Sequence, residues 1–224
     1  MGEKQISSAS RYEKLADLFH KMTGAEGREK TVLVVGAGQG YEVLALKRHF
    51  GNVRGIEINM SGVIPEAKHA IDEGDATSIH FANESFDILY CYHVLEHILN
   101  PLAALHEMKR VLKRGGILYL GVPNKSRLFS YLFVREEHLR TRLLWNLIDY
   151  RARLLGKFEN QYGAHAGFNS QELGALLKGV FSSAKEVGDQ YYTLKYPGSR
   201  LVRSLLKIRS LEFLWPSIYF LCRK

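Results

Sequence analysis

Three glycines at alternate positions form the first candidate site in this sequence. Gly36, Gly38 and Gly40 directly follow the aliphatic run of residues 32–35, which predicts a strand buried on both faces, and they precede a helix-competent stretch. Glycine reaches turn conformations that are closed to other residues, and it has no Cβ atom to hold a ligand away from the main chain. We therefore expect a ligand to lie flat against this loop, near the exposed amides that open the helix. The spacing G-x-G-x-G departs from the dinucleotide fingerprint G-x-G-x-x-G, which argues against NAD.

Two carboxylates stand at the ends of later strands. Glu57 lies near the end of a second predicted strand, residues 53–58, where its two acceptor oxygens match the cis-diol of a ribose. Asp75 lies in a Gly-Asp-Ala turn that closes a third short strand, residues 71–76, and could accept a hydrogen bond from an exocyclic adenine amine. A surface glutamate and an ordinary turn aspartate are the alternatives.

His93, Glu96 and His97 form a third candidate group. If the chain is helical from Val94 onward, these positions share one face, and two imidazoles with a carboxylate are reasonable ligands for a divalent metal. The alternative is that Glu96 and His97 fix the loop through hydrogen bonds. A cluster of three residues is a weak metal signal, so we assign no metal. Loss of activity in a chelator, restored by added metal, would reverse that assignment.

The elements that must position these residues alternate in type along the chain. A leading helix is predicted at residues 10–23, and the turn at Gly115 and Gly116 precedes the last of five predicted strands. The predicted order of strands and helices is 32–35 (strand), 42–49 (helix), 53–58 (strand), 61–71 (helix), 71–76 (strand), 86–92 (strand), 101–113 (helix) and 117–122 (strand). Such alternation predicts a parallel sheet with helices on both faces.

Five motifs together resemble class I S-adenosylmethionine-dependent methyltransferases, in particular the group that includes ubiquinone and menaquinone biosynthesis enzymes. They are GAGQG, IEI, GDA, ESFDILYCYHVLEHI and LKRGGILYLGVPN, in this order. The resemblance covers residues 31–124 well, and FNSQELGALLKGVF and YFLCRK more loosely. It implies an α/β fold with a Rossmann-like, seven-stranded, mostly parallel sheet, whose last strand, residues 217–222, runs antiparallel.

The resemblance also implies a set of cofactor-binding residues. The glycine loop would line the methionine and ribose of S-adenosylmethionine, Glu57 would hold the ribose, Asp75 and Ala76 would meet the adenine, and Tyr92 and His93 would border the sulfonium. The full expected set is Gly36, Ala37, Gly38, Gly40, Glu57, Ile58, Asp75, Ala76, Tyr92 and His93.

One position departs from the family pattern. The family usually has an acidic residue two positions before the first glycine, where this chain has Val34. That carboxylate commonly organises the loop and the water around the amino group of the cofactor. Its absence either weakens cofactor binding or moves the task to Glu42.

Histidines are the candidate catalytic bases. Methyl transfer from a sulfonium requires alignment of an in-line displacement, and a base when the nucleophile must lose a proton. We select His93 and His165, the latter in a loop of small residues before a helix that Asn169 and Glu172 can cap. A structural loop histidine is the alternative for His165, and His138 lies in a charged run where we expect it to be solvated.

Two basic amphipathic stretches lie outside the predicted sheet. Residues 126–162 follow the fifth strand as a helical insertion, which could form a lid because ligands of open α/β sheets sit beyond the carboxyl ends of the strands. Residues 199–213 carry an apolar stripe formed by Leu201, Leu205, Ile208 and Leu211. Either stripe could simply pack on the domain. The sharper hypothesis is a substrate lid, or a face that rests on an anionic membrane.

Composition limits the class of protein and the number of domains. The chain has 224 residues, 46% hydrophobic and 24% charged, which is typical of one globular α/β domain. We divide it into a leading helix and linker (1–30), a cofactor-binding core (31–125), the insertion (126–162) and a C-terminal part (163–224). Cys91 and Cys222 lie in apolar runs, where we expect buried, unreactive thiols.

The net charge of +8 is concentrated toward the C-terminus. The last 30 residues hold seven basic side chains and one acidic one, whereas residues 1–124 hold fourteen and fifteen. The positive field would attract an anionic substrate, nucleic acid or membrane. The polar N-terminus shows no signal peptide, and we expect a cytoplasmic location.

We therefore predict an S-adenosylmethionine-dependent methyltransferase that acts on a small-molecule or lipid-linked acceptor, at oxygen. An RNA methyltransferase is the first alternative, but the chain lacks the aromatic and basic clustering typical of base-stacking surfaces. A catalytically silent binding module, suggested by Val34, is the second.

Overall fold

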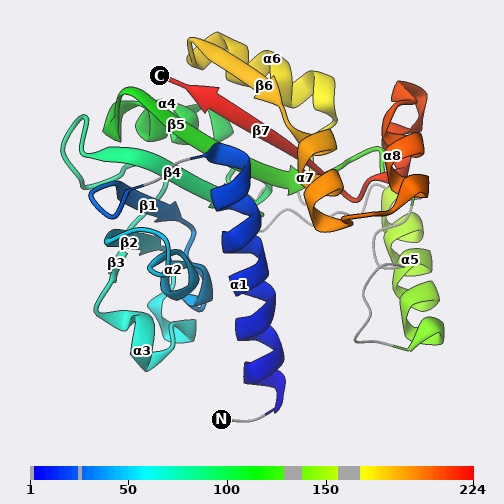
Figure 1. Ribbon diagram of the computed structural model, residues 1–224, viewed down its shortest axis with the longest axis horizontal. Coiled ribbons are helices and arrows are strands. Elements are labelled where there is room, and N and C mark those ends of the chain that lie inside the picture. Colours follow the sequence, from blue (N-terminus) through cyan, green and yellow to red (C-terminus); the bar gives the residue numbers. More distant parts are fainter. Residues whose placement is uncertain (1–2, 25–26, 129–137, 156–166) are drawn as a thin grey trace.

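The computed structural model describes residues 3–24, 27–128, 138–155 and 167–224. Its centre is a seven-stranded sheet with the order β3-β2-β1-β4-β5-β7-β6 (Figure 1). The strands are β1 (Thr31–Val35), β2 (Asn52–Glu57), β3 (Ile71–Glu73), β4 (Phe86–Tyr92), β5 (Leu112–Pro123), β6 (Ser183–Glu186) and β7 (Ser217–Arg223).

The direction of the strands confirms the predicted sheet. Four strand pairs are parallel: β1–β2, β1–β4, β2–β3 and β4–β5. The β7 strand runs antiparallel to both of its neighbours, β5 and β6. The strand order reverses between β1 and β4, and in open α/β sheets ligands bind at the carboxyl ends of the strands beside such a reversal. This topology directs attention to the loops that follow β1, β2 and β4.

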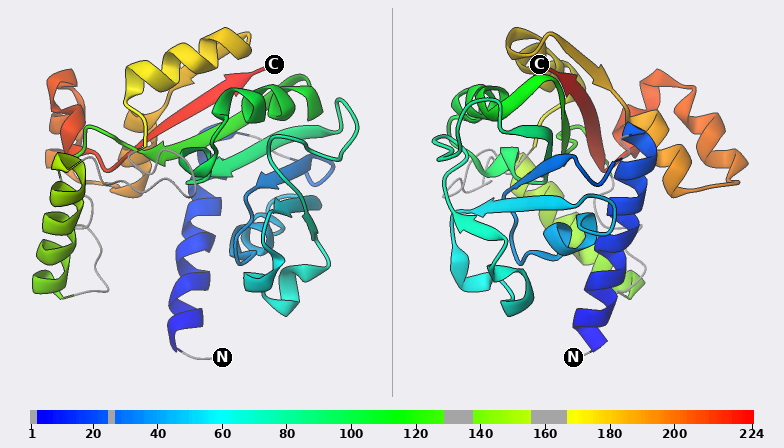
Figure 2. Two further views of the ribbon diagram at one scale, coloured as in Figure 1. Left: turned by 180° about the vertical axis from the view of Figure 1, so that it is seen from behind. Right: turned by 60° about the vertical axis from the view of Figure 1, so that its left-hand side comes forward.

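Helices cover both faces of the sheet (Figure 2). One face packs against α1, α2 and α7, and the other packs against α4 and α6. The helices are α1 (Glu3–Thr23), α2 (Tyr41–Leu46), α3 (Pro65–Lys68), α4 (Pro101–Val111), α5 (Leu139–Leu154), α6 (Ser170–Val180), α7 (Gly188–Lys195) and α8 (Arg200–Leu206), with short 3-10 turns η1 (Met60–Gly62), η2 (Leu95–His97) and η3 (Arg209–Leu214).

The α1 face of the sheet is rich in aromatic side chains. Tyr90, Tyr119 and Tyr219 are buried and form a row of stacked rings, with centroids 5.4 Å apart between the first pair and 6.0 Å apart between the second. Phe19 of α1 meets the first two of these rings, and Tyr191 of α7 stacks 3.8 Å from the third. Rings with few rotamers in a close-packed layer give the carboxyl edge a rigid support.

Several predicted elements have different boundaries in the structure. The prediction of one helix over residues 61–71 was wrong, because the segment forms η1 and then the short α3. Pro65 explains the break: it lacks an N–H and holds the preceding Ile64 in an extended conformation, so it can only start a helix. The leading helix is longer than predicted and begins at Glu3.

The predicted turn at Gly115 and Gly116 lies inside β5. The register passes from Phe86–Leu112 to Ile88–Ile117, so extra residues bulge out of β5 at this point. Gly115 has a φ of +73°, which a glycine adopts at low cost. A sequence pattern that is typical of a turn therefore marks an irregularity in a continuous strand.

Two predictions about side chains are confirmed. The α6 helix carries the expected capping box, in which Asn169 and Glu172 bond each other's backbone amides. Cys91 and Cys222 are buried free thiols, and burial raises the pKa of both. Neither is suited to nucleophilic attack.

The apolar stripe of residues 199–213 is divided, since Leu205 and Leu211 are half-buried and the other two members are not. Leu201 and Ile208 are exposed, at 69% and 49% of their surface. Instead, Val202 and Leu206 of α8 pack against the core. No helix in the described ranges is long and apolar enough to cross a bilayer.

Candidate functional site

The glycine loop after β1 is open at one position. Gly36, Gly38 and Gly40 all have positive φ angles, of 69°, 52° and 94°. A Cβ atom at Gly36 or Gly40 would clash with neighbouring side chains, at 2.4 Å from Val94 and 2.3 Å from Ala67, whereas one at Gly38 would meet nothing within 4 Å. Two of the glycines therefore serve packing, and the third leaves the space that a ligand needs.

Glu57 reaches this open position from the end of β2. The backbone amide of Gly38 donates to Glu57 Oε2 at 2.7 Å, and the amide of Asn59 donates to Oε1 at 3.2 Å. Ala37 fixes the loop to the same strand by donating its amide to the carbonyl of Ile56 at 2.9 Å. Each carboxylate oxygen keeps a further lone pair, so the group can accept the two hydroxyls of a ribose beside the loop.

The turn after β3 lies next to β2. The amide of Gly74 donates to the Glu57 carbonyl at 3.0 Å, which holds the two strand ends together. Asp75 Oδ1 accepts bonds from the amide and hydroxyl of Thr77, at 2.7 and 2.8 Å, so this oxygen shapes the turn. Ala76 is half-buried and Ile58 is 68% exposed, so the predicted adenine site has an apolar side chain free to cover it.

The end of β4 supplies Tyr92, and the loop that follows supplies His93. His93 has a φ of +55°, a conformation that costs energy for a residue with a Cβ atom. Its ring nitrogens lie between two elements: Nδ1 is 3.3 Å from Glu96 Oε1, and Nε2 is 3.4 Å from Ser217 Oγ of β7. The Tyr92 ring meets the His93 ring edge-on at 4.4 Å, and burial raises the pKa of the Tyr92 phenol. The histidine is thus held in one orientation at the carboxyl edge.

Glu96 and His97 lie next to this histidine. Glu96 has a side chain only 2% exposed, and its Oε1 is 3.8 Å from His97 Nε2 as well as close to His93. Its second oxygen is buried without a partner. Across the four described ranges, no group of three or more His, Cys, Asp or Glu side chains is arranged to hold a metal ion. The arrangement resembles the hydrogen-bonded loop that was the alternative to the metal hypothesis.

Two other histidines were considered in the sequence. His165 falls outside the described residues, so its role as a base stays a prediction. His138 is exposed at the start of α5, as expected for a solvated side chain.

Sequence reasoning missed two contributors to the edge. Ser217 contacts His93 only because β7 pairs with β5 in the register that places Ser217 opposite Pro123. Tyr12 of α1 stacks on Tyr41 at 5.6 Å, directly after the glycine loop. Both contacts join segments far apart in the chain, and no local motif indicates them.

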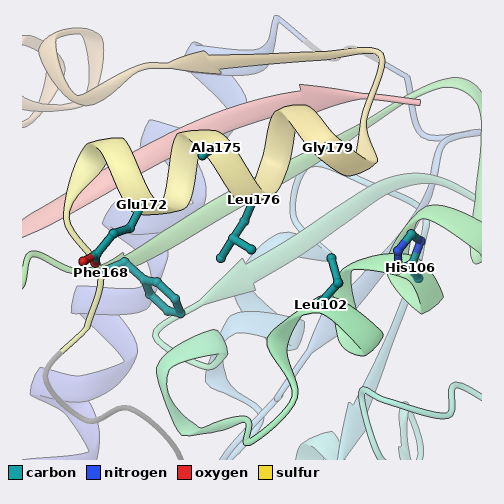
Figure 3. Close-up of a pocket in the computed structure, with 7 residues that line it drawn as sticks. All are labelled: Leu102, His106, Phe168, Glu172, Ala175, Leu176 and Gly179. Carbon is teal, nitrogen blue, oxygen red and sulfur yellow. The ribbon is translucent and has the colours of Figure 1, made fainter.

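A groove of about 730 Å³ lies elsewhere, between α4 and α6 (Figure 3). Its lining is mostly apolar, with Leu102 on one side and Leu176 on the other, and Glu172 at one end. None of the residues predicted to bind the cofactor lines it. The groove is therefore distinct from the edge formed by Gly38, Glu57 and His93.

Comparison with known proteins finds sequence similarity to methyltransferases over part of the chain. Residues 33–120 match the model of a family described as "Methyltransferase domain". The ubiquinone biosynthesis O-methyltransferase of Actinobacillus pleuropneumoniae serotype 7 is 30% identical over 120 residues, which are 47% of this chain and 50% of that protein. The chain thus matches about half the length of this relative.

Solved structures share the fold over a larger part of the chain. A SAM-dependent methyltransferase from Thermotoga maritima superposes with a TM-score of 0.56 and 19% identity, covering 82% of this chain and 78% of that one. A proposed S-adenosyl-L-methionine-dependent methyltransferase from Methanococcus maripaludis gives a TM-score of 0.61 at 16% identity, covering 99% and 91%. At such identities the likeness concerns the fold.

Proposed function

We propose that this chain is a class I S-adenosylmethionine-dependent methyltransferase that transfers the methyl group of S-adenosylmethionine to a hydroxyl of a small or lipid-linked acceptor. The observation that carries the proposal is the carboxyl edge, where the open position at Gly38 and the Glu57 carboxylate meet in one hydrogen bond. S-adenosylmethionine supplies an electrophilic methyl on a sulfonium, which needs no metal or covalent intermediate. The protein's tasks are to hold the cofactor and the acceptor in line and to remove a proton.

The residues present suit this cofactor. The bare side of Gly38 leaves room for a ligand against the main chain, and Glu57 offers two acceptor oxygens for a ribose diol. Tyr92, the last residue of β4, and His93, the residue after it, would border the methionine end. Ile58 and Ala76 would flank the adenine, with Asp75 offering its second oxygen.

His93 is the candidate base of the reaction. Glu96 and Ser217 hold its two ring nitrogens, so the imidazole has a fixed orientation at the edge. With its proton on Nδ1 directed toward the buried Glu96 carboxylate, His93 has a single acceptor lone pair, on Nε2. An acceptor hydroxyl that takes the place of the Ser217 hydroxyl at Nε2 would transfer its proton there. This arrangement supports transfer to oxygen, because a hydroxyl must lose its proton on methylation.

The activity is tested by incubating the protein with labelled S-adenosylmethionine and lipid or phenolic extracts. Labelled product, lost in His93→Ala with retained cofactor binding, would support the proposal. Cofactor binding with no transfer to any extract would favour the silent module. Label that disappears on nuclease treatment would favour RNA as the acceptor.

The α5 helix supports a lipid-linked acceptor. Its polar side faces the protein body: Asn146 is buried, and the Asp149 carboxylate is 3.3 Å from Arg127, which is also buried. Its apolar side faces outward, with more than half of each side chain exposed at Leu139, Leu143, Leu144, Leu147 and Ile148. A continuous exposed apolar face of this kind marks an interaction surface.

The charges around the apolar face of α5 indicate the kind of surface that this face contacts. Residues 138–155 contain four arginines and one aspartate. The α8 helix adds exposed Arg200 and Arg203 beside the exposed Leu201, and the exposed Lys207 directly follows it. Both helices lie beyond the arrowheads of β4 and β5, on the side of the candidate site (Figure 1). An apolar face rimmed by cations fits the surface of an anionic bilayer, where a lipid-linked acceptor would be embedded.

Liposome sedimentation tests this contact. We expect sedimentation with vesicles that contain an anionic lipid and none with zwitterionic vesicles. Leu143→Ser/Leu147→Ser and Arg203→Glu/Lys207→Glu should each reduce it about tenfold, since burial of each leucine and each surface cation contributes about 1 kcal/mol or more. Lys178→Glu/Lys185→Glu, at exposed positions on α6 and β6, is the matched control. Equal loss in the control, or no binding by the wild type, would end the membrane proposal.

A further inference from the structure

The apolar groove between α4 and α6 has no part in the proposed cofactor site. Leu176 of α6 and Leu102 of α4 point toward each other across it (Figure 3). Its α6 wall consists of residues at helical positions i, i+3, i+4 and i+7, which are Glu172, Ala175, Leu176 and Gly179. Its volume of about 730 Å³ lies within the range of about 300 to 1,000 Å³ that is typical of small-molecule sites. The groove is therefore large enough to hold a ligand of its own.

One end of the groove lies at the carboxyl end of β5. Phe168, which lines this end, donates its amide to the carbonyl of Pro123, the last residue of β5, at 3.2 Å. The preceding Gly167 permits this approach, because its φ is +81° and a Cβ atom there would lie 2.1 Å from the Pro123 carbonyl oxygen. Pro123 pairs in turn with Ser217, whose Oγ is 3.4 Å from His93 Nε2. The groove thus begins beside the candidate base.

Apolar side chains also connect the loop after β4 to the opposite wall of the groove. Val94 and Ile98, which flank the η2 turn, pack against the core cluster that contains Phe168. Leu99 follows and is 79% exposed, and Leu102, in the first turn of α4, is 44% exposed. Exposed leucines that adjoin an apolar groove mark an interaction surface. This surface extends from the catalytic loop into the groove.

The polar side chains of the groove leave little charge for a ligand to neutralise. Glu172 is the one carboxylate among the lining residues in the described part of the chain. Its Oε1 is 3.1 Å from Lys125 Nζ, and its Oε2 accepts the amide of Asn169 at 3.2 Å. His106, exposed on α4, stands near the other end of the groove (Figure 3). An uncharged apolar ligand suits this lining better than a charged peptide does.

We propose that the groove binds the hydrocarbon chain of a lipid-linked acceptor whose reactive hydroxyl lies at His93. The inference rests on the proposed function and adds to it the site of the acceptor chain. A chain drawn from a bilayer into water exposes apolar surface at a cost proportional to its area. An acceptor hydroxyl that leaves the bilayer for the carboxyl edge therefore requires an apolar path for its chain. The groove provides such a path, starting at Phe168.

Binding of a fluorescent fatty acid, cis-parinaric acid, measures the capacity of the groove for a chain. We expect the wild type to bind it, uncharged decanol to displace it and butanol to leave it bound. Ala175→Trp fills the groove from an exposed position and should weaken the fatty acid at least about tenfold. Lys178→Trp, at an exposed position of α6 outside the groove, is the matched control and should stay within about twofold.

A second filling variant guards against a local effect of one tryptophan. A side chain added at Gly179 meets nothing within 4 Å of its Cβ, so Gly179→Leu should fold and weaken the fatty acid in the same direction. No binding by the wild type, or equal affinities of the wild type and Ala175→Trp, would overturn the proposal. Failure of decanol to compete would also overturn it, because the carboxylate and not the chain would then be bound.

Sedimentation velocity tests the alternative occupant, a second copy of this chain. We expect the wild type and Ala175→Trp to have the same oligomeric state. A dimer of the wild type that Ala175→Trp abolishes would assign the groove to a subunit contact and overturn the proposal.

Two further readouts separate this proposal from the proposed function. All three variants should bind S-adenosylhomocysteine as the wild type does, which also reports folding. With labelled S-adenosylmethionine and a lipid extract, Ala175→Trp should raise the extract concentration at half-maximal rate about tenfold and leave the maximal rate unchanged. A wild type that binds S-adenosylhomocysteine but not the fatty acid would refute the groove alone. A wild type that binds the fatty acid but not S-adenosylhomocysteine would refute the proposed function.

Discussion

At the amino edge of the sheet the carboxylate of Asp87 is surrounded by donors, whereas near the carboxyl edge the carboxylate of Glu42 is half-buried and makes no ion pair or side-chain hydrogen bond with the described residues. Asp87 Oδ2 accepts from the amide and hydroxyl of Thr31, at 3.0 and 2.7 Å, and from Lys113 Nζ at 2.8 Å. Burial alone would raise the pKa of Asp87, but these bonds outweigh it and lower the pKa to about 2. Burial raises the pKa of Glu42 to about 7.

The difference separates a compensated carboxylate from an uncompensated one. The bonds of Asp87 join β1, β4 and β5 at their start and leave little capacity for a ligand. Glu42 keeps its capacity and destabilises the free protein above neutral pH. Functional sites commonly retain such uncompensated groups, whose cost is recovered when the ligand binds.

Replacing the amino-edge carboxylate should produce the larger effect on stability. Asp87→Asn should lower the free energy of unfolding by about 2 kcal/mol at pH 7. The folded pKa of Asp87 lies about two pH units below its unfolded value, so the ionised carboxylate stabilises the folded state. Urea denaturation measures this loss, and affinity for S-adenosylhomocysteine should not change. Glu13→Gln, which breaks an exposed pair with Arg48 at 3.1 Å, is the control and should cost less than about 1 kcal/mol.

The pH dependence sharpens the same prediction. The folded pKa of Asp87 lies below the unfolded value of 3.8, so its contribution is fully present above pH 4 and is lost as the pH falls toward 2. The difference between wild type and Asp87→Asn should shrink over this range. A difference that stays constant down to pH 2 would contradict the ionised, paired state of Asp87.

Replacing the carboxyl-edge carboxylate should have a smaller effect on stability, with the opposite sign. The folded pKa of Glu42 lies above its unfolded value of 4.5, so its stabilising contribution is present below pH 4.5 and lost as the pH rises through 7. Glu42→Gln should match the wild type at pH 5 and exceed its free energy of unfolding by about 1 to 2 kcal/mol at pH 8. Thermal melts at both pH values measure this difference. A variant less stable than the wild type at pH 8 would contradict the uncompensated state of Glu42.

Much of the sheet and of the glycine-loop geometry follows from local sequence. β4 occupies the predicted residues 86–92, and Glu57 ends β2 where the pattern places it. These features depend on runs of apolar residues and on glycine spacing, which act over a few residues. The capping box of α6 is local in the same sense.

The features that sequence missed depend on contacts between distant segments. Ser217 reaches His93 through the β5–β7 register, and Tyr12 of α1 stacks on Tyr41 of α2. Periodicity finds the apolar side of α5 but not whether it faces inward, because Asp149 and Asn146 dock the helix by its polar side. Such choices are made by packing and pairing across the whole fold.

The most direct test of the cofactor site is a calorimetric titration of the wild type and of Glu57→Ala with S-adenosylhomocysteine. Glu73→Ala, at the exposed position paired with Glu57 in the β2–β3 register, is the control. We expect micromolar binding by the wild type and the control, and a loss of about 100-fold in Glu57→Ala, because two hydrogen bonds to a charged acceptor contribute roughly 3 kcal/mol. No binding by the wild type, or equal binding by Glu57→Ala, would contradict the assignment of this edge as a cofactor site.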